Sequence, residues 1–137
     1  KVKPVMESLD LVIVAAEWGE GKRARWLSSY TVACRDRNKL KDVGKVGTGL
    51  KEKSEEGVSF QELTEELKKD VIEEKGRQVV VKPKIVVEVV FEEIQKSPSY
   101  TSGFALRFPR ILRVRYDRGV HDIATLKEVE HLYLQQK

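Results

Sequence analysis

The residues best suited to chemistry in this 137-residue sequence are cations that gather in one short segment. Residues 103–118 hold five arginines and one acid, whereas residues 55–74 hold eight acids and two bases. The five are Arg107, Arg110, Arg113, Arg115 and Arg118. A guanidinium suits phosphate because its planar fork can donate two parallel hydrogen bonds. The local basic excess therefore predicts a surface for an anionic partner such as nucleic acid.

A second basic group lies in the expected turn at residues 19–25, which contributes Lys22, Arg23 and Arg25. Its Gly-Glu-Gly-Lys-Arg sequence is only superficially similar to a phosphate-binding loop, because the glycine spacing is wrong and no helix follows the lysine. We expect this loop tip to contact a nucleic-acid backbone. A solvated turn is the alternative.

Charge alone leaves other interpretations open. The 26 Lys and Arg residues exceed the 22 Asp and Glu residues only slightly, so the net charge of +4 is modest. Charge blocks are common on surfaces, so a solvated face beside an acidic helix would give the same totals. The arginines could also pair across a sheet with Glu88, Glu92 or Glu93.

No conventional enzyme site is evident elsewhere in the sequence. His121 and His131 lack the Cys or acidic spacing of a metal site, so no metal ligands are predicted. The single cysteine, Cys34, is expected to be a small core residue rather than a nucleophile. The longest apolar run, residues 11–16, is too short to span a bilayer, and no signal segment is seen. We therefore expect a cytoplasmic protein without a membrane partner, and the Lys and Glu content hints at a thermophilic source.

Hydrophobic periodicity predicts a mainly β domain with two helices that would position these cations. The expected elements are strands at 9–18, 27–35 and 40–46, a helix at 59–75 ending near Gly76, strands at 78–94 and 104–116, and a terminal helix from Asp122 or Thr125. Ser59 with Glu62 and Thr125 with Glu128 form the two expected capping boxes. This order is that of a five-stranded Greek-key OB-fold barrel, with a helix between strands 3 and 4 and a C-terminal helix.

Residues 104–116 have a period of two, which predicts an arginine face and an apolar face on one strand. The expected arginine face holds Arg107, Arg113 and Arg115, and Pro109 suggests a bulge or an edge. The side chains expected to face the core are Phe104, Leu106, Phe108, Leu112, Val114 and Tyr116.

Residues 102–118, with the sequence SGFALRFPRILRVRYDR, resemble motif VI and its approach in ATP-dependent DNA ligases, especially archaeal-type ones. Residues 10–23, 43–49 and 93–98 resemble further blocks of that family in the same order, and Lys1-Val2-Lys3-Pro4 resembles the end of motif V. The resemblance covers essentially the whole chain. It implies that residues 1–8 are the end of motif V and a linker from an adenylation domain, and that residues 9–137 are the OB-fold domain.

The resemblance implies a DNA ligase of replication and repair that uses ATP and Mg²⁺. Such enzymes attach AMP to a lysine of a Lys-x-Asp-Gly motif in the preceding domain. That motif does not occur here, so the chain alone should be inactive. By the same resemblance Arg115, Asp117 and Arg118 match the motif VI Arg-x-Asp-Lys that orients the leaving pyrophosphate, with arginine where the family usually has lysine.

Further site residues follow from the same resemblance. Lys1 and Lys3 are implied as phosphate ligands. The expected contacts with nicked duplex DNA are Lys22, Arg23, Arg25, Arg107, Arg110 and Arg113. The implied partners are nicked duplex DNA, the adenylation and DNA-binding domains of the same full-length chain, and a sliding clamp. The protein would then be associated with the nucleoid.

Three other functions remain open from the sequence. A stand-alone single-strand-binding OB protein needs exposed aromatic platforms, but the aromatic fraction is only 7% and the strand aromatics are expected in the core. An RNA ligase or capping-type nucleotidyltransferase is less similar over residues 102–110. A purely structural or protein-interaction barrel would leave the arginine face unexplained.

Overall fold

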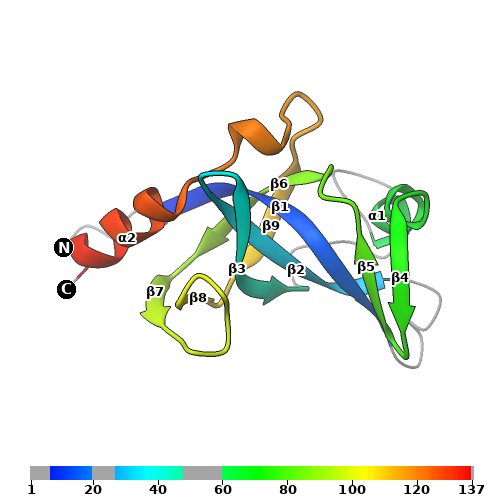
Figure 1. Cartoon of the computed structure of the whole chain (residues 1–137), viewed down its shortest axis with the longest axis horizontal. Helices are drawn as coiled ribbons and strands as arrows, with labels where there is room; N and C mark the ends of the chain where they lie inside the picture. Colours follow the sequence, from blue (N-terminus) through cyan, green and yellow to red (C-terminus); the bar gives the residue numbers. More distant parts are fainter. Residues whose placement is uncertain (1–6, 20–26, 48–59, 137) are drawn as a thin grey trace.

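A computed structural model describes residues 7–19, 27–47 and 60–136, and Figure 1 shows how they are arranged. The strands are β1 (Glu7–Trp18), β2 (Leu27–Asp36), β3 (Lys39–Val46), β4 (Val71–Lys75), β5 (Gln78–Val81), β6 (Val86–Phe91), β7 (Glu93–Lys96), β8 (Phe104–Arg107) and β9 (Arg110–Val114). The helices are α1 (Phe60–Lys68) and α2 (Leu126–Gln135), with a 3-10 turn η2 (Val120–Asp122) between β9 and α2. The predicted mainly β class with two helices is confirmed.

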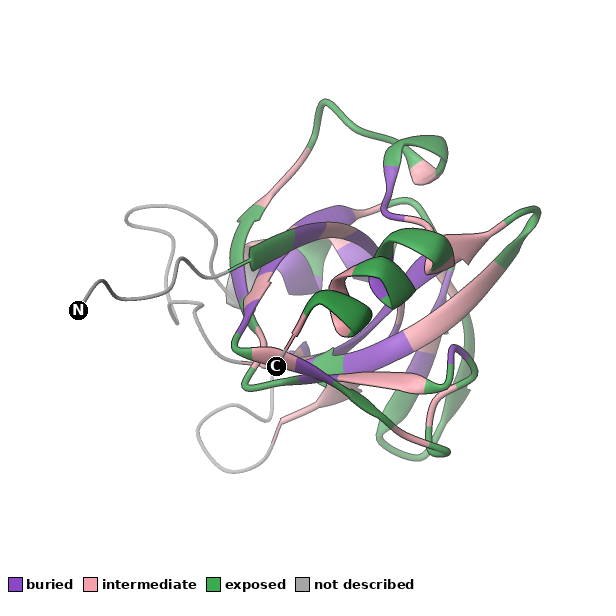
Figure 2. Ribbon diagram, turned by 90° about the vertical axis from the view of Figure 1, so that its left-hand side faces the viewer, coloured by how far each residue is buried: buried purple, intermediate pink, exposed green. Residues whose placement is uncertain are grey.

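The long strand β1 organises a seven-stranded sheet. Its first half pairs with β6 and its second half with β5, while β2 pairs along its other edge, all antiparallel. The sheet is extended by β3 beside β2, β4 beside β5 and β9 beside β6. A register irregularity between Ile13 and Ala15 interrupts the pairing with β2, and such irregularities bend a strand. The sheet curls into a half-barrel, as Figures 1 and 2 show.

The β7–β8 hairpin is a separate two-stranded sheet that lies against β3. At Gly44 of β3 a Cβ atom would lie 3.7 Å from the backbone nitrogen of Leu106 in β8. The loop between β7 and β8 also contacts β3. The backbone N–H of Asp42 in β3 donates to the hydroxyl of Thr101 in this loop over 2.8 Å. This hairpin therefore continues the wall of the barrel.

Alternation along β1 separates two hydrophobic clusters. Leu11 and Ile13 face the larger cluster, to which α1 contributes Leu67 and α2 contributes Val129. Figure 2 shows buried segments of the strands inside the curl, with much of α2 exposed. The smaller cluster lies on the other face of β1 and consists of Val12, Ala33, Val86 and Ile123.

The predicted helix at residues 59–75 is shorter than expected. Helix α1 ends at Lys68, and residues 71–75 form β4, which pairs with β5. Gly76, expected at a helix end, instead has φ +59° in the turn of this hairpin. The helical spacing of Val71 was misleading because cross-strand pairing with Val81 competes for the same residue. Ser59 lies outside the described residues, so its predicted capping box with Glu62 stays a prediction.

The predicted strand at residues 104–116 is two strands rather than one. Phe108, with φ +52°, ends β8, and β9 pairs with β6 in the other sheet. A register shift in β9 opposite Glu88 and Val89 then changes which side chains face inward. Ile111 is therefore buried at 2% exposure. The expected core positions of Phe108, Leu112 and Tyr116 are wrong, since these side chains are 59%, 59% and 68% exposed.

The second capping box is confirmed at the start of α2. The Thr125 hydroxyl accepts a hydrogen bond from the backbone N–H of Glu128 over 3.2 Å, and the Glu128 carboxylate accepts one from the Thr125 N–H over 3.3 Å. The helix begins at Leu126, as the Thr125 alternative predicted. In the described part of the chain no helix is long and apolar enough to cross a membrane.

Thr125→Ala is expected to lower the free energy of unfolding by about 1 kcal/mol, because it removes the side-chain acceptor at the N-terminus of α2. Thr125→Ser keeps the hydroxyl and should retain most of that stability. Urea unfolding of the two variants measures the difference. Equal loss in both would contradict a capping role for the hydroxyl.

Candidate functional site

Two of the predicted arginines lie on the barrel wall and are paired with glutamates. Arg107 of β8 pairs with Glu93 of β7 over 2.8 Å, and Arg113 of β9 pairs with Glu88 of β6 over 2.6 Å. The alternative prediction, that arginines pair with glutamates across the sheet, is therefore correct for Arg107 and Arg113. Hydrogen bonding from Arg113 lowers the pKa of Glu88, against the opposing effect of burial. Both arginines remain partly exposed, so each can still meet an external anion.

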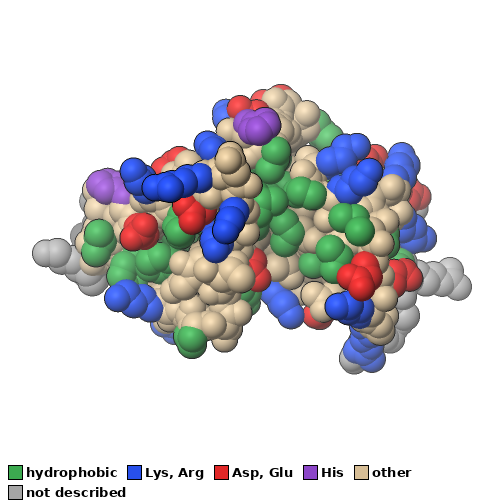
Figure 3. Space-filling model, viewed as in Figure 1, with side chains coloured by type: hydrophobic (Ala, Val, Ile, Leu, Met, Phe, Trp, Pro, Cys, Tyr) green, Lys and Arg blue, Asp and Glu red, His purple; other side chains and the backbone are tan. Residues whose placement is uncertain are grey.

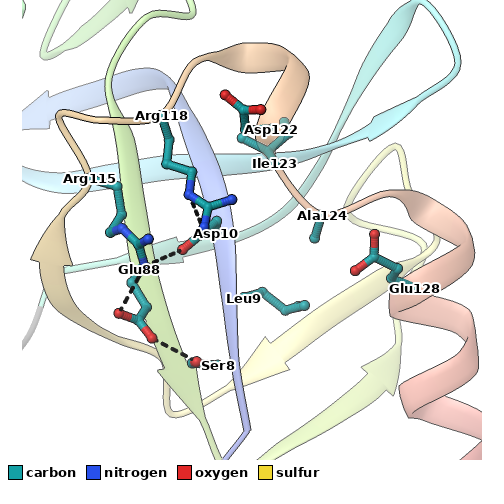
Figure 4. A pocket seen from close by; sticks show the side chains of 10 residues that line it. All are labelled: Ser8, Leu9, Asp10, Glu88, Arg115, Arg118, Asp122, Ile123, Ala124 and Glu128. Atoms are coloured by element: carbon teal, nitrogen blue, oxygen red, sulfur yellow. Dashed lines mark hydrogen bonds and ion pairs between the residues drawn. The ribbon is translucent and has the colours of Figure 1, made fainter.

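Arg115 and Arg118 lie together at a pocket of about 290 Å³ near the start of β1. Figure 4 shows both guanidinium groups directed toward Asp10 of β1, with Glu88 and Ser8 beside them. Arg115 Nη1 is 3.7 Å from Asp10 Oδ1 and 3.7 Å from Glu88 Oε1, and Arg118 Nε is 3.7 Å from Asp10 Oδ2. The predicted grouping of Arg115 with Arg118 is thus present in the fold. Arg115 stays next to Arg113, since both approach Glu88 Oε1, whereas Arg107 pairs with Glu93 in the β7–β8 hairpin.

The segment after β9 holds these arginines in place. The backbone N–H of Arg115 donates to the Val86 carbonyl over 2.7 Å, and that of Ala124 donates to the Asp10 carbonyl over 2.8 Å. Between these two anchors the chain turns outward through η2, and Ile123 returns to the smaller hydrophobic cluster. The resulting strap is residues 115–125. It fixes the backbone of both arginines above Asp10.

Asp117 lies at the rim of the pocket and is mostly exposed. Its carboxylate accepts a hydrogen bond from Arg115 Nε over 3.4 Å. A backbone hydrogen bond and then the Arg115 side chain lower the pKa of Asp117. Desolvation opposes the charge of Arg115, but Asp117, Asp10 and Glu88 together raise its pKa. The contact between Arg115 and Asp117 therefore favours the charged form of both side chains.

The pocket is acidic on balance. Two arginines and four carboxylates line it, the carboxylates being Asp10, Glu88, Asp122 and Glu128. The Asp122 carboxylate accepts from the backbone N–H of Gly119, and the Glu128 carboxylate belongs to the α2 cap. Among the described residues no group of three or more His, Cys, Asp or Glu side chains could hold a metal ion.

An exposed aromatic side chain beside the arginines was missed by the sequence reasoning. The ring of Phe108 lies 5.1 Å from the Arg107 guanidinium carbon, and its positive φ turns it away from the core. The signal that could have found it is Pro109, which follows it and disfavours a continuous strand. Figure 3 shows that Lys and Arg side chains on this view occupy several separate groups, with hydrophobic side chains exposed between them.

Asp10 was also missed as part of the site. An acid between the buried residues Leu9 and Leu11 is the signal that the sequence offered. Five predicted site residues lie outside the described residues, namely Lys1, Lys3, Lys22, Arg23 and Arg25. Cys34 is buried, as expected for a core residue, and burial raises the pKa of its thiol to about 12.

Comparison with known proteins places this chain in a family. The family model for the ATP dependent DNA ligase C terminal region matches residues 23–118. The chain belongs to the ATP-dependent DNA ligases. It is similar to the DNA ligase of Nanoarchaeum equitans, with 57% identity over 141 residues that cover 100% of this chain and 25% of that protein. With the DNA ligase of Archaeoglobus fulgidus the identity is 50% over 138 residues, which cover 99% of this chain and 24% of that ligase.

The solved ligase domain of LigD from M. tuberculosis has the same fold. It aligns with a TM-score of 0.70 and 23% identity over 87% of this chain and 38% of that structure. The predicted OB-fold domain of an archaeal-type ligase is thereby confirmed. The chain spans about a quarter of the length of its archaeal ligase relatives, so it corresponds to their C-terminal part alone.

The Arg113–Glu88 pair gives this ligase domain a specific pH dependence. The pKa of Glu88 is lowered from 4.5 in the folded chain, so the pair stabilises the fold above that pH and the stabilisation is lost as the pH falls through the folded value. Arg113→Ala should therefore cost about 1 kcal/mol near pH 7, and the difference from the parent should shrink in acid. Urea unfolding at neutral and acid pH measures this. A difference that stays constant down to pH 3 would contradict it.

Proposed function

We propose that this chain is the DNA-binding and active-site-closing domain of a full-length ATP-dependent DNA ligase. The observation that carries the proposal is the joint placement of Arg115 and Arg118 at one pocket, each with its guanidinium next to Asp10. Fixed cations held this close to each other suit a polyphosphate better than a single charge. In this proposal the domain closes over ATP and directs both arginines at the β- and γ-phosphates.

The chemistry of the first step explains why such cations would be needed. A lysine amine of the adenylation domain attacks the α-phosphorus of ATP, and the bond to the bridging oxygen of the β-phosphate breaks. Negative charge accumulates on the departing pyrophosphate, and preorganised guanidinium groups stabilise it. Asp117 keeps the Arg115 side chain oriented, while Lys1 and Lys3 would add further cations. Arg118 would donate through a planar fork where the family usually has lysine.

Mg²⁺ is expected for the full-length enzyme, but the described residues do not offer it a site. The carboxylates nearest the arginines are already opposite guanidinium groups or bound to backbone N–H groups. No metal-binding group occurs among residues 7–19, 27–47 and 60–136. No step is therefore assigned to Mg²⁺ within this domain.

For the later steps the domain is proposed to bind duplex DNA at a nick. Arg107, Arg110 and Arg113 on β8 and β9 would contact phosphates, together with Lys22, Arg23 and Arg25. Phe108 adds an exposed apolar ring between the arginines, suited to the sugars and base edges of a groove. Such contacts carry little sequence information, as an enzyme that seals any nick requires.

Single-strand binding is the second candidate function, because one sequence argument against it has failed. Phe108 and Tyr116 are exposed rather than buried and could stack on bases. The match to DNA ligases over residues 23–118 favours the duplex proposal over this one and over an RNA ligase or capping enzyme. The wider role would be DNA replication and repair in an archaeal, nucleoid-associated and thermophilic setting, with a sliding clamp as a further partner.

Arg115→Ala in the full-length ligase is expected to slow lysine adenylation by about 100-fold, because one cation is lost from the leaving group. Sealing of a pre-adenylated nick should change far less. Single-turnover assays of the two steps measure this separation. Equal loss in both steps, or none in adenylation, would refute the leaving-group role.

Binding of this chain to nicked duplex DNA should weaken steeply with salt, and Arg107→Ala or Arg113→Ala should each reduce the salt slope by about 1. Fluorescence anisotropy across a salt series measures the slope. Glu93→Gln is the matched control, since it removes the acid that competes for Arg107 and should not reduce the slope. Salt-independent binding, or strong preference for single strands, would support the second candidate.

A further inference from the structure

Two carboxylates face each other across the strands that underlie the arginine pocket. Asp10 of β1 and Glu88 of β6 are directly opposite in the antiparallel pairing. Their side chains are only 17% and 15% exposed. Like charges in opposite positions of a sheet destabilise it, and partial burial increases that cost. The pair is therefore stable in this fold only with cations beside it.

The two carboxylates do not share those cations equally. Glu88 has its shortest contact, 2.6 Å, with Arg113, and its other oxygen accepts from the Ser8 hydroxyl over 2.9 Å. Asp10 lies next to Arg115 and Arg118, as Figure 4 shows, and Arg115 is equally distant, 3.7 Å, from Asp10 and Glu88. The ion pairs of Asp10 with described residues are to these two arginines, one through each carboxylate oxygen. Asp10 thus bridges the two arginines of motif VI.

The backbone of Asp10 is fixed to the same strap that carries the arginines. Its carbonyl accepts from Ala124, at the point where Ile123 anchors the strap in the smaller hydrophobic cluster. The Asp10 side chain therefore contacts one end of the strap, at residues 115–118, and the Asp10 carbonyl binds the other end, at residue 124. A rigid strand is the best support for such a contact, because it limits motion of the carboxylate.

The contacts from Asp10 are ion pairs at 3.7 Å rather than short hydrogen bonds. An aspartate at this distance can fix the direction of a guanidinium without occupying its N–H groups. From the Arg115 side chain to other described residues there is one hydrogen bond, to Asp117 at the exposed rim. The remaining N–H donors stay available for an incoming phosphate.

We propose that Asp10 is a positioning residue for adenylation, which sets the spacing and direction of Arg115 and Arg118 so that both reach the leaving pyrophosphate together. This inference rests on the proposed role of the two arginines. It adds that their effect depends on a carboxylate supplied by the opening strand of the same domain. Asp10 does not itself touch ATP.

The test is Asp10→Asn in the full-length ligase. Asparagine keeps the size of the side chain but places an amide NH₂ toward one guanidinium, so one arginine loses its acceptor. We expect kcat for adenylation to fall about tenfold with little change in KM for ATP, because orientation matters most in the transition state. Sealing of a pre-adenylated nick should be unchanged. Unchanged adenylation would overturn the proposal. Faster adenylation would also overturn it, because it would mean that Asp10 only competes with phosphate for the arginines.

Two further measurements separate positioning from general damage to the fold. In an Arg115→Ala, Arg118→Ala background, Asp10→Asn should have no further effect on adenylation, whereas a purely structural role would give additive losses and overturn the proposal. If Asp10→Asn impairs both steps, Asp10→Glu decides. It keeps the charge but displaces the carboxylate, so slower adenylation with intact sealing supports the proposal, and normal adenylation overturns it.

Glu17→Gln is the matched control. Glu17 lies on the same strand and pairs with Lys45 over 3.1 Å, away from the pocket. This variant should leave both steps unchanged. Failure of the positioning role of Asp10 can also be distinguished from failure of the proposed arginine role. If Arg115→Ala leaves adenylation intact, the arginine role itself fails, whereas slow Arg115→Ala with normal Asp10→Asn refutes only the positioning role.

Discussion

The structure depends on one strand that serves three partners. The first half of β1 pairs with β6 and its second half pairs with β5. Its opposite edge pairs with β2. Because side chains alternate along it, Leu11 and Ile13 fill the barrel while Asp10 and Val12 face the other side. The strand that organises the core therefore also carries Asp10, which pairs with the arginines, and Val12, which packs against the strap. Changes to the curl of β1 would move the site as well as the core.

The sequence was sufficient for the parts of this domain that depend on local signals. The first three strands, the Thr125 cap and the buried state of Cys34 follow from propensity, capping and composition, which act over a few residues. The family could be predicted from residues 102–118 because motif identity does not depend on register. The extent of α1 could not, since pairing between β4 and β5 overrides a helical pattern.

The orientation of residues 104–116 depended on contacts that no local pattern contains. A period of two predicts faces only while the register is continuous. The break at Phe108 exposes that ring, and the shift in β9 buries Ile111 where Leu112 was expected. Arg115 lies between Arg113, with which it shares Glu88, and Arg118, with which it shares Asp10. Asp10 is more than one hundred residues away in sequence from either Arg115 or Arg118. Only the tertiary fold brings Asp10 together with Arg115 and Arg118.

The arginines of the site are balanced by acids of the same domain. A cluster of exposed arginines with no acids nearby would repel itself and bind any anion, whereas Arg107, Arg113 and Arg115 each have a carboxylate within the domain. The Arg107 and Arg113 side chains are 49% and 60% exposed, so their ion pairs contribute only modestly to stability, whereas Arg115 is 16% exposed. In the function proposed above, these arginines exchange their carboxylates for phosphates of DNA or ATP. Pairing is looser in the pocket, where Arg115 is 3.7 Å from Asp10, than on the wall, where Arg113 is 2.6 Å from Glu88. The proposed leaving-group role needs available donors in the pocket, whereas the wall pair joins β9 to β6 within the sheet.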